Sequence, residues 1–306
     1  MSYTKKEFLC PSSDGIHTLS GVIYLPEGEA KAYFHIVHGM TEHIGRYDRI
    51  MSDLAAEGYI CFGYDNLGHG KTARDESEFG YIAKKKGWDL LARDVKVFSD
   101  AVKTEIGLDL PYCLMGHSMG SFITRVAVER YVTPDRFVIM GTGGPNPAAG
   151  AGLALISLIK LFKGDRHIST FIDKVAFGTY NSRFEGDSDF CEKSWLTTDQ
   201  SIREKYLEDG YCTFKFTVSA MGDLMRLLKL SNRGAWFKNL PDIPLLIVSG
   251  EDDPVGGFGK GIRTVEKKLL KAGKNVKCLI YKGARHEILN DFTYDTVKND
   301  IISFIR

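Results

Sequence analysis

The chain contains the stretch Tyr112-Cys113-Leu114-Met115-Gly116-His117-Ser118-Met119-Gly120, in which an apolar run leads into the pattern G-x-S-x-G. A helical pattern follows at Ser121–Tyr131. Between a strand and a helix, this pattern is typical of a nucleophile elbow, a turn so tight that flanking side chains would clash unless they are glycine. Such a turn exposes the hydroxyl of Ser118 and points a helix N-terminus at the group that the serine would attack. The alternative interpretation is a glycine-rich turn with an incidental serine.

Strands and helices are predicted to alternate on both sides of this turn. The apolar runs are short and two-sided, which is typical of a mostly parallel sheet covered by helices on both faces. The predicted fold class is therefore α/β. The predicted strands are Lys6–Cys10, Thr18–Tyr24, Ala32–Val37, Tyr59–Tyr64, Tyr112–Met115, Phe137–Met140, Pro244–Ser249 and Val276–Tyr281, and the predicted helices are Tyr47–Glu57, Trp88–Glu105, Ser121–Tyr131, Lys260–Leu270 and Tyr294–Ile305.

The alternation breaks after a hinge-like segment, Gly141–Pro147. The following stretch, Ala148–Phe237, shows helical patterns without obvious core strands, and its length of about 90 residues is too great for a plain loop. We therefore expect a helical cap inserted into one sheet domain. The expected division is core at 1–144, cap at 145–238 and core again at 239–306.

The composition excludes several functional classes. The 306 residues can form one large core with an inserted module. The 40 Lys and Arg nearly balance the 39 Asp and Glu, which argues against a nucleic-acid partner and gives no electrostatic reason for membrane attachment. The N-terminus lacks the apolar region of a signal peptide, and no run reaches the ~18 apolar residues of a spanning helix. The six cysteines include no C-x-x-C pair, so we expect neither a zinc site nor a disulfide framework. The same pattern predicts a cytoplasmic location.

The serine needs a base within hydrogen-bond reach, and the base needs an orienting carboxylate. In this architecture the chain order is Ser, then Asp or Glu, then His. Only His167 and His286 follow Ser118. His286 comes just after the last predicted strand, at the sheet edge where active-site groups of open α/β sheets gather, so it is the predicted base. His167 lies in the helical insertion and is interpreted as a surface residue.

The orienting carboxylate should come from the loop after the strand that precedes Val276–Tyr281 in the chain. The loop after Pro244–Ser249 offers Glu251, Asp252 and Asp253 in succession. Asp253 precedes a proline, which restricts its backbone to an extended conformation and fixes the direction of its side chain. The sequence favours Asp253, with Asp252 as the alternative.

An oxyanion hole needs two backbone N–H groups that point at the developing negative charge. Met119, the residue after the serine, supplies one from the start of the helix. The second should come from the loop after the strand Ala32–Val37, where His38-Gly39-Met40 stands. The glycine lets the backbone bend, and the N–H of Met40 is the expected donor.

Three motifs together resemble the monoacylglycerol lipases and bacterial lysophospholipases, a group of serine hydrolases. The resemblance covers the sheet domain on both sides of the insertion, but the insertion itself does not align with the short cap of those lipases. The motifs are His38-Gly39-Met40-Thr41-Glu42-His43-Ile44-Gly45-Arg46-Tyr47 (H-G-x-x-E-H-x-x-R-Y), Asp65-Asn66-Leu67-Gly68-His69-Gly70 (D-x-x-G-H-G) and the elbow G-H-S-M-G.

The resemblance implies an α/β-hydrolase fold, no cofactor, no metal, and cleavage of carboxylic esters of acyl chains through an acyl-enzyme. On the matching positions it implies Ser118, Asp253 and His286 as a catalytic triad, with Met40 and Met119 as oxyanion donors. It further implies that Glu42, His43 and Arg46 brace the oxyanion loop rather than touch substrate.

Two other functions remain open on the sequence. One is an aminopeptidase or amidase of the proline iminopeptidase type, which shares the scaffold and needs an acidic group, such as Asp199 or Glu204, to hold a substrate amine. The other is a non-catalytic ligand-binding protein on the same scaffold. The presence of Ser118, Asp253 and His286 argues against the second.

Two stretches of the cap are candidates for substrate binding. Leu153–Phe162 is apolar almost all round, so it must bury both sides, against protein or against lipid. It is expected to line an acyl pocket or to make transient contact with a membrane or micelle surface; the alternative is packing within the cap. The aromatic-rich stretch Trp195–Met221 is interpreted mostly as cap core, with a substrate wall as the alternative. Its marked residues are Trp195, Asp199, Tyr211, Phe214, Phe216 and Met221.

Overall fold

The computed structural model describes residues 2–306. Its centre is an eight-stranded sheet in the order β1-β2-β4-β3-β5-β6-β7-β8. β1 pairs antiparallel with β2, β2 pairs antiparallel with β4, and all other pairings are parallel. The strands are β1 (Tyr3–Pro11), β2 (Thr18–Pro26), β3 (Ala32–Val37), β4 (Tyr59–Tyr64), β5 (Tyr112–His117), β6 (Arg136–Met140), β7 (Leu245–Gly250) and β8 (Val276–Tyr281).

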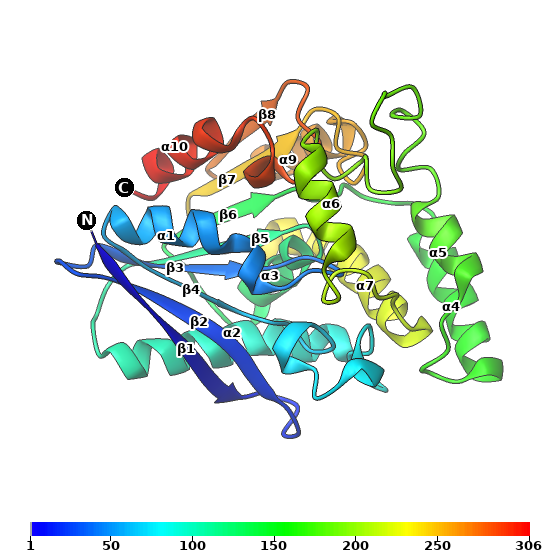
Figure 1. Cartoon of the computed structure of the whole chain (residues 1–306), viewed down its shortest axis with the longest axis horizontal. Helices are drawn as coiled ribbons and strands as arrows, with labels where there is room; N and C mark the ends of the chain where they lie inside the picture. The colour runs from blue at the N-terminus through cyan, green and yellow to red at the C-terminus, as the bar shows by residue number, and fades with distance from the viewer. Residues whose placement is uncertain (1) are drawn as a thin grey trace.

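Helices cover both faces of the sheet (Figure 1), which confirms the predicted α/β fold class. Along β3, side chains alternate between two apolar layers. Phe34 and Ile36 pack in one layer with helices α1 (Asp48–Ala56) and α10 (Tyr294–Ile305), while Tyr33 and Val37 face the other. This second layer contains residues of α2 (Gly87–Ile106), α3 (Met119–Arg130) and α9 (Lys260–Lys271).

The turn from β5 into α3 is as tight as the pattern G-x-S-x-G predicts. A Cβ on Gly120 would lie 2.0 Å from the carbonyl oxygen of Val37, and one on Gly116 would lie 2.4 Å from that of Gly120. Only glycine fits at these two positions, because Gly120 packs directly on the end of β3 and Gly116 packs on the first turns of α3. Ser118 between them has φ 52° and ψ −120°, a strained conformation for a residue with a side chain.

The segment between β6 and β7 forms five helices, and it contains no strand among the described residues. The helices are α4 (Ala149–Lys163), α5 (Thr170–Phe177), α6 (Gln200–Glu208), α7 (Val218–Ser231) and α8 (Gly234–Asn239). In Figure 1, α4 and α5 project away from the sheet, whereas α7 runs back toward α2 and α3 and contacts both. Because α7 joins the projecting helices to the core, the exact limits of the cap at 145–238 stay a prediction.

The all-round apolar stretch Leu153–Phe162 does not pack on both sides within the cap. Ile156 is buried, but Leu158, Leu161 and Phe162 are 54%, 77% and 75% exposed. The helix therefore packs within the cap through one face, against α7, and leaves its other face exposed. Among the marked aromatic residues, Phe216 and Met221 are core, while Tyr211 is 40% exposed and is not. The remaining element bounds differ from the predicted ones by a few residues at most, as is usual at fraying ends.

Candidate active site

Ser118 lies at the C-terminal edge of the sheet, between β5 and the first turn of α3. Its N–H donates to the carbonyl of Met140 at the end of β6 (3.0 Å), and its own carbonyl accepts from the N–H of Ser121 (2.9 Å). Both bonds involve the main chain, so the strained backbone is fixed while the side chain is left to line a cavity. Strain of this kind is found where function requires a particular geometry.

His286 and Asp253 lie together, as their positions after β8 and β7 predict. Nδ1 of His286 is 2.9 Å from Oδ2 of Asp253, and both side chains are almost fully buried. The other carboxylate oxygen accepts the N–H of Val255 (2.8 Å). Asp252, the alternative, instead pairs with Arg183 at the surface (3.2 Å). The geometry therefore selects Asp253 as the partner of His286, and it leaves Nε2 of the imidazole free of that bond.

The loop after β3 lies directly against the serine. A Cβ on Gly39 would be 2.9 Å from Cβ of Ser118, and the next residue, Met40, lines the same cavity as Ser118 and Met119. His38 holds the start of this loop: its Nδ1 contacts the carbonyl of Gly39 (2.8 Å) and its Nε2 accepts the N–H of Asn66 (2.9 Å). Burial lowers the pKa of His38 to about 3, so the ring is neutral and both bonds persist at physiological pH.

Glu42 joins this loop to the elbow. Its carboxylate accepts the N–H of Gly39 (2.5 Å) and the hydroxyl of Tyr47 (3.0 Å), and it lies 3.2 Å from Nδ1 of His117. Burial would raise the pKa of Glu42, but the bond to His117 and the nearby charges hold it well below its ordinary value. Burial would lower the pKa of His117, but Glu42 raises it above its ordinary value. The two groups form a buried ion pair beside Ser118.

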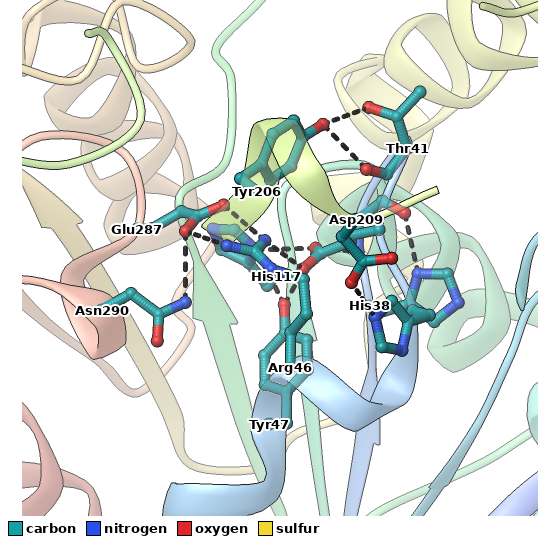
Figure 2. Close-up of polar contacts among 12 residues, drawn as sticks. His38, Thr41, Arg46, Tyr47, His117, Tyr206, Asp209, Glu287 and Asn290 are labelled. Atoms are coloured by element: carbon teal, nitrogen blue, oxygen red, sulfur yellow. Dashed lines mark hydrogen bonds and ion pairs between the residues drawn. The ribbon is translucent and has the colours of Figure 1, made fainter. Parts of the chain in front are cut away.

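Arg46 extends the same network to the loop of the predicted base (Figure 2). It donates to Glu42 (3.2 Å) and makes two 2.7 Å bonds to the carboxylate of Glu287, the residue after His286. A bidentate pair of this kind fixes orientation as well as distance. Glu42 and Arg46 thus tie the loop after β3 to the elbow and to the loop of His286, whereas His43 bonds to Asp209 of the cap. The bracing role that the family resemblance implies for these three residues stays a prediction.

A cavity of about 1380 Å³ opens above Ser118 between the sheet edge and the cap. Ser118, His286, Met40 and Met119 all line it, and so does Leu155 of α4. Both apolar and polar residues line it. Apolar lining residues include Phe122, Ile156, Ile172, Leu224, Met225 and Leu228, and polar ones include Thr41, Asn181, Tyr206 and Thr213.

The sequence placed Trp195 and the stretch around Tyr206 among the cap candidates, but it did not predict which residues they contact. Tyr206 of α6 donates to the carbonyl of Thr41 (2.8 Å), and Trp195 places its ring 5.0 Å from that of His286, centroid to centroid. Neither contact has a local signature, because the partners lie more than 80 residues apart. The proposed amine-binding candidates do not reach the site: Asp199 caps α6 and Glu204 bonds to Gln200, and neither lines the cavity.

The structure offers one group that could hold a metal ion among residues 2–306. It consists of His43, Asp209 and Cys212. Nε2 of His43 already bonds to Asp209 (2.9 Å), and burial raises the pKa of the Cys212 thiol well above its ordinary value. A metal needs the thiolate and a free imidazole nitrogen, so this group fits a cap contact better than a metal centre.

We expect Glu42→Gln to lower the free energy of unfolding by about 3 kcal/mol, because it leaves a buried partner without its counter-charge. The stability from the raised pKa of His117 is present below 6.5 and is lost as pH rises through that raised pKa. The stability from the lowered pKa of Glu42 is present above 4.5 and is lost as pH falls through that lowered pKa. The difference from wild type should therefore be largest between these values and shrink toward pH 9.

Urea unfolding at several pH values measures this difference. Glu57→Gln is the control, because Glu57 is 49% exposed at the surface and should change stability by less than about 0.5 kcal/mol at every pH. A difference for Glu42→Gln that stays flat from pH 5 to pH 9 would contradict the ion pair.

Residues 28–293 match the model of the serine aminopeptidase S33 family. The chain is 24% identical to a monoacylglycerol lipase of Mycolicibacterium smegmatis over 100% of this chain and 98% of that one. It is 35% identical to the monoglyceride lipase of Mus musculus over 34% and 33% of the two chains. The fold matches that of a carboxyl esterase from Bacillus coagulans with a TM-score of 0.92 and 28% identity, over 100% and 98% of the chains. The chain therefore belongs to the serine aminopeptidase S33 family and is an α/β-hydrolase of the lipase and esterase type.

Proposed function

We propose that the protein hydrolyses carboxylic esters of acyl chains through an acyl-enzyme on Ser118. The observation that carries this proposal is the pair of His286 and Asp253, which share a 2.9 Å bond at the edge of the cavity that Ser118 lines. A buried carboxylate on Nδ1 fixes the tautomer in which Nε2 can accept a proton.

The reaction would follow from this arrangement. The Oγ of Ser118 attacks the ester carbonyl while Nε2 of His286 takes its proton, and Asp253 stabilises the resulting imidazolium. The N–H groups of Met40 and Met119 bind the oxyanion. His286 then returns the proton to the leaving alcohol. A water molecule, activated by the same histidine, releases the acid from Ser118.

The cavity supports a monoacylglycerol-like or lysophospholipid-like substrate. Its volume exceeds the roughly 300–1,000 Å³ of ordinary small-molecule sites, which leaves room for an acyl chain. Phe122, Ile156 and Leu224 can contact the chain, while Asn181 and Thr213 offer polar groups to the alcohol. An amphipathic ester matches a cavity that both apolar and polar residues line.

The aminopeptidase alternative fits the cavity less well. An amine-binding site needs a free carboxylate, but Glu42 and Glu287 are both bonded to Arg46. Of the other acidic lining residues, Asp173 lies 3.9 Å from Lys215, and Glu192 is exposed to solvent, where an ion pair with an amine contributes little. Five lysines line the same cavity, and their charge disfavours a cationic substrate: Lys174, Lys193, Lys215, Lys260 and Lys268.

We expect Ser118→Ala to abolish both ester hydrolysis and labelling by a fluorophosphonate probe. Asp253→Asn should lower kcat by about 10³–10⁴-fold, because the imidazole loses its orienting charge. Asp252→Asn is the matched control and should retain activity within about two-fold, since its carboxylate pairs with Arg183 at the surface. A folded wild-type protein that neither labels nor turns over would favour the non-catalytic binding protein instead.

A substrate panel tests the class. We expect p-nitrophenyl esters and 1-monoacylglycerols or lysophospholipids to be cleaved, with kcat/KM rising from acetyl to longer acyl chains as the apolar wall fills, by up to about 0.8 kcal/mol per buried CH₂. Aminoacyl arylamides should be cleaved at least about 10³-fold more slowly, because no buried carboxylate is free to hold their amine. Comparable rates on both classes would return the aminopeptidase to first place.

We further propose that α4 and α5 make transient contact with a lipid or micelle surface. Leu158, Leu161 and Phe162 of α4 and Phe171 and Val175 of α5 are all more than half exposed. Val175 also lines the cavity, so the apolar surface borders the entrance. No helix among the described residues is long and apolar enough to cross a membrane, and contact at the surface is the interaction that such a patch supports.

Replacing Leu161 and Phe162 together by serine should lower activity on micellar esters by about ten-fold and leave hydrolysis of short soluble esters unchanged. The paired replacement of Ile16 and Leu108 by serine is the control, because these residues are also exposed but lie outside the cap. Equal loss on micellar and soluble esters would refute the surface contact.

A further inference from the structure

The main chain that carries His286 is hydrogen-bonded to the cap. The N–H of His286 donates to the carbonyl of Trp195 (3.4 Å), and the N–H of Glu287 donates to the carbonyl of Leu196 (2.7 Å). Trp195 and Leu196 lie in the loop between α5 and α6, about 90 residues before their partners in the chain. The predicted catalytic base thus takes part of its support from outside the sheet domain.

Arg285, directly before His286, reinforces this contact. Its Nη1 donates to the carbonyls of Ser194 (2.6 Å) and Thr197 (3.4 Å), and its Nη2 pairs with Asp187. The guanidinium also lies over the ring of Phe184, 4.1 Å from the centroid, and the residue is 9% exposed. All of these partners belong to the cap, so one arginine of the core holds the cap loop from the position next to the base.

A third set of bonds closes the other end of the loop. Thr197 Oγ1 donates to the carbonyl of Asn290 (2.6 Å), and the N–H of Thr198 donates to Asp291 (3.2 Å). Asp291 in turn accepts the N–H of Arg285 (3.3 Å). The cap residues 194–198 and the core residues 285–291 therefore form one continuous bonded strip.

The bond to Asp253 cannot replace this strip. It fixes Nδ1 of the imidazole, but it leaves the position of the histidine backbone to the surrounding loop. On the core side, Gly250 packs closely on the carbonyls of Ala284 and Arg285, within 2.2 Å of where a Cβ would lie. Gly250 thus limits the loop from one side and the cap strip limits it from the other.

We propose that Arg285 and the cap segment Ser194–Thr198 are positioning elements for His286, so that this part of the cap belongs to the catalytic apparatus and does not serve substrate selection alone. The proposal rests on the proposed function of Ser118 and His286. Rotation of the cap as one body would break the strip and displace the base, so this segment stays in place while substrate enters elsewhere.

The test uses the full-length protein and a short soluble ester, p-nitrophenyl acetate, which needs little of the acyl wall. Arg285→Ala should lower kcat by about 10²-fold, the cost of misplacing a catalytic group by about 1 Å, with KM changed by no more than about two-fold. The rate of fluorophosphonate labelling of Ser118 should fall in parallel, because it also needs His286. Arg285→Lys should recover part of kcat through the bond to Ser194.

Arg203→Ala is the matched control. Arg203 is also buried and donates to the same carbonyl of Thr197 (2.8 Å), but its other partner is Asp189 of the cap, and it has no bond to the histidine loop. Thermal unfolding of both variants measures the general structural cost. The proposal predicts similar losses of stability but a much larger loss of kcat for Arg285→Ala.

A second variant tests the proposal in case Arg285→Ala does not fold. Thr197→Val keeps the shape of the side chain, removes the bond to Asn290 and should lower kcat several-fold with KM retained. The inference is overturned if Arg285→Ala and Thr197→Val match wild type in kcat, or if Arg203→Ala loses as much kcat as Arg285→Ala. A wild-type protein that is not labelled at Ser118 would overturn the proposed function itself, which is a separate result.

Discussion

The buried carboxylate of Glu42 is the constraint on which the site depends. An ionised group inside a protein is costly unless each oxygen is satisfied, and Glu42 gathers Gly39, Tyr47, His117 and Arg46 around itself. These partners come from the loop after β3, from the turn that follows it and from the elbow. Because one anion holds all of them, this loop and the elbow that carries Ser118 cannot shift independently.

Arg46 links the network around Glu42 to the loop of His286. Its bidentate bond to Glu287 ties the histidine loop to the same network, while its guanidinium lies 4.9 Å from the ring centroid of Tyr206 in the cap. The site is thus assembled from four segments that are distant in sequence and are joined by charge. The sheet supplies the common edge, and the ion pairs set the distances across it.

The sequence predicted those parts of the molecule that have a local signature. The elbow is read from two glycines around Ser118, since only glycine fits against the end of β3. His286 follows from chain order and from its place after the last strand. Only the proline after Asp253 distinguishes it from Asp252 in the sequence. In the structure, the side chain of Asp253 turns inward to His286, and that of Asp252 turns outward to Arg183.

The remainder of the site depends on contacts between distant residues. His117 occupies a variable position of the G-x-S-x-G pattern, which predicts no role for it. In the structure, it is buried beside Glu42 and forms an ion pair with it. The all-round apolar pattern of α4 predicted burial on both sides, but the helix projects from the core and exposes Leu161 and Phe162 instead. The apolar pattern of a helix shows which of its side chains favour burial. It does not show whether protein or lipid covers them.

The cap therefore has two different physical roles within one insertion. The loop at Ser194–Thr198 is held by hydrogen bonds to the core, whereas α4 and α5 present apolar side chains that no described residue covers. Hydrogen bonds hold the loop in one geometry. The exposed apolar surface of α4 and α5 can instead exchange contact with water for contact with lipid. The loop lies beside His286 and the apolar surface borders the cavity, so under the proposed function an amphipathic substrate would enter past α4 and α5 while His286 keeps its position.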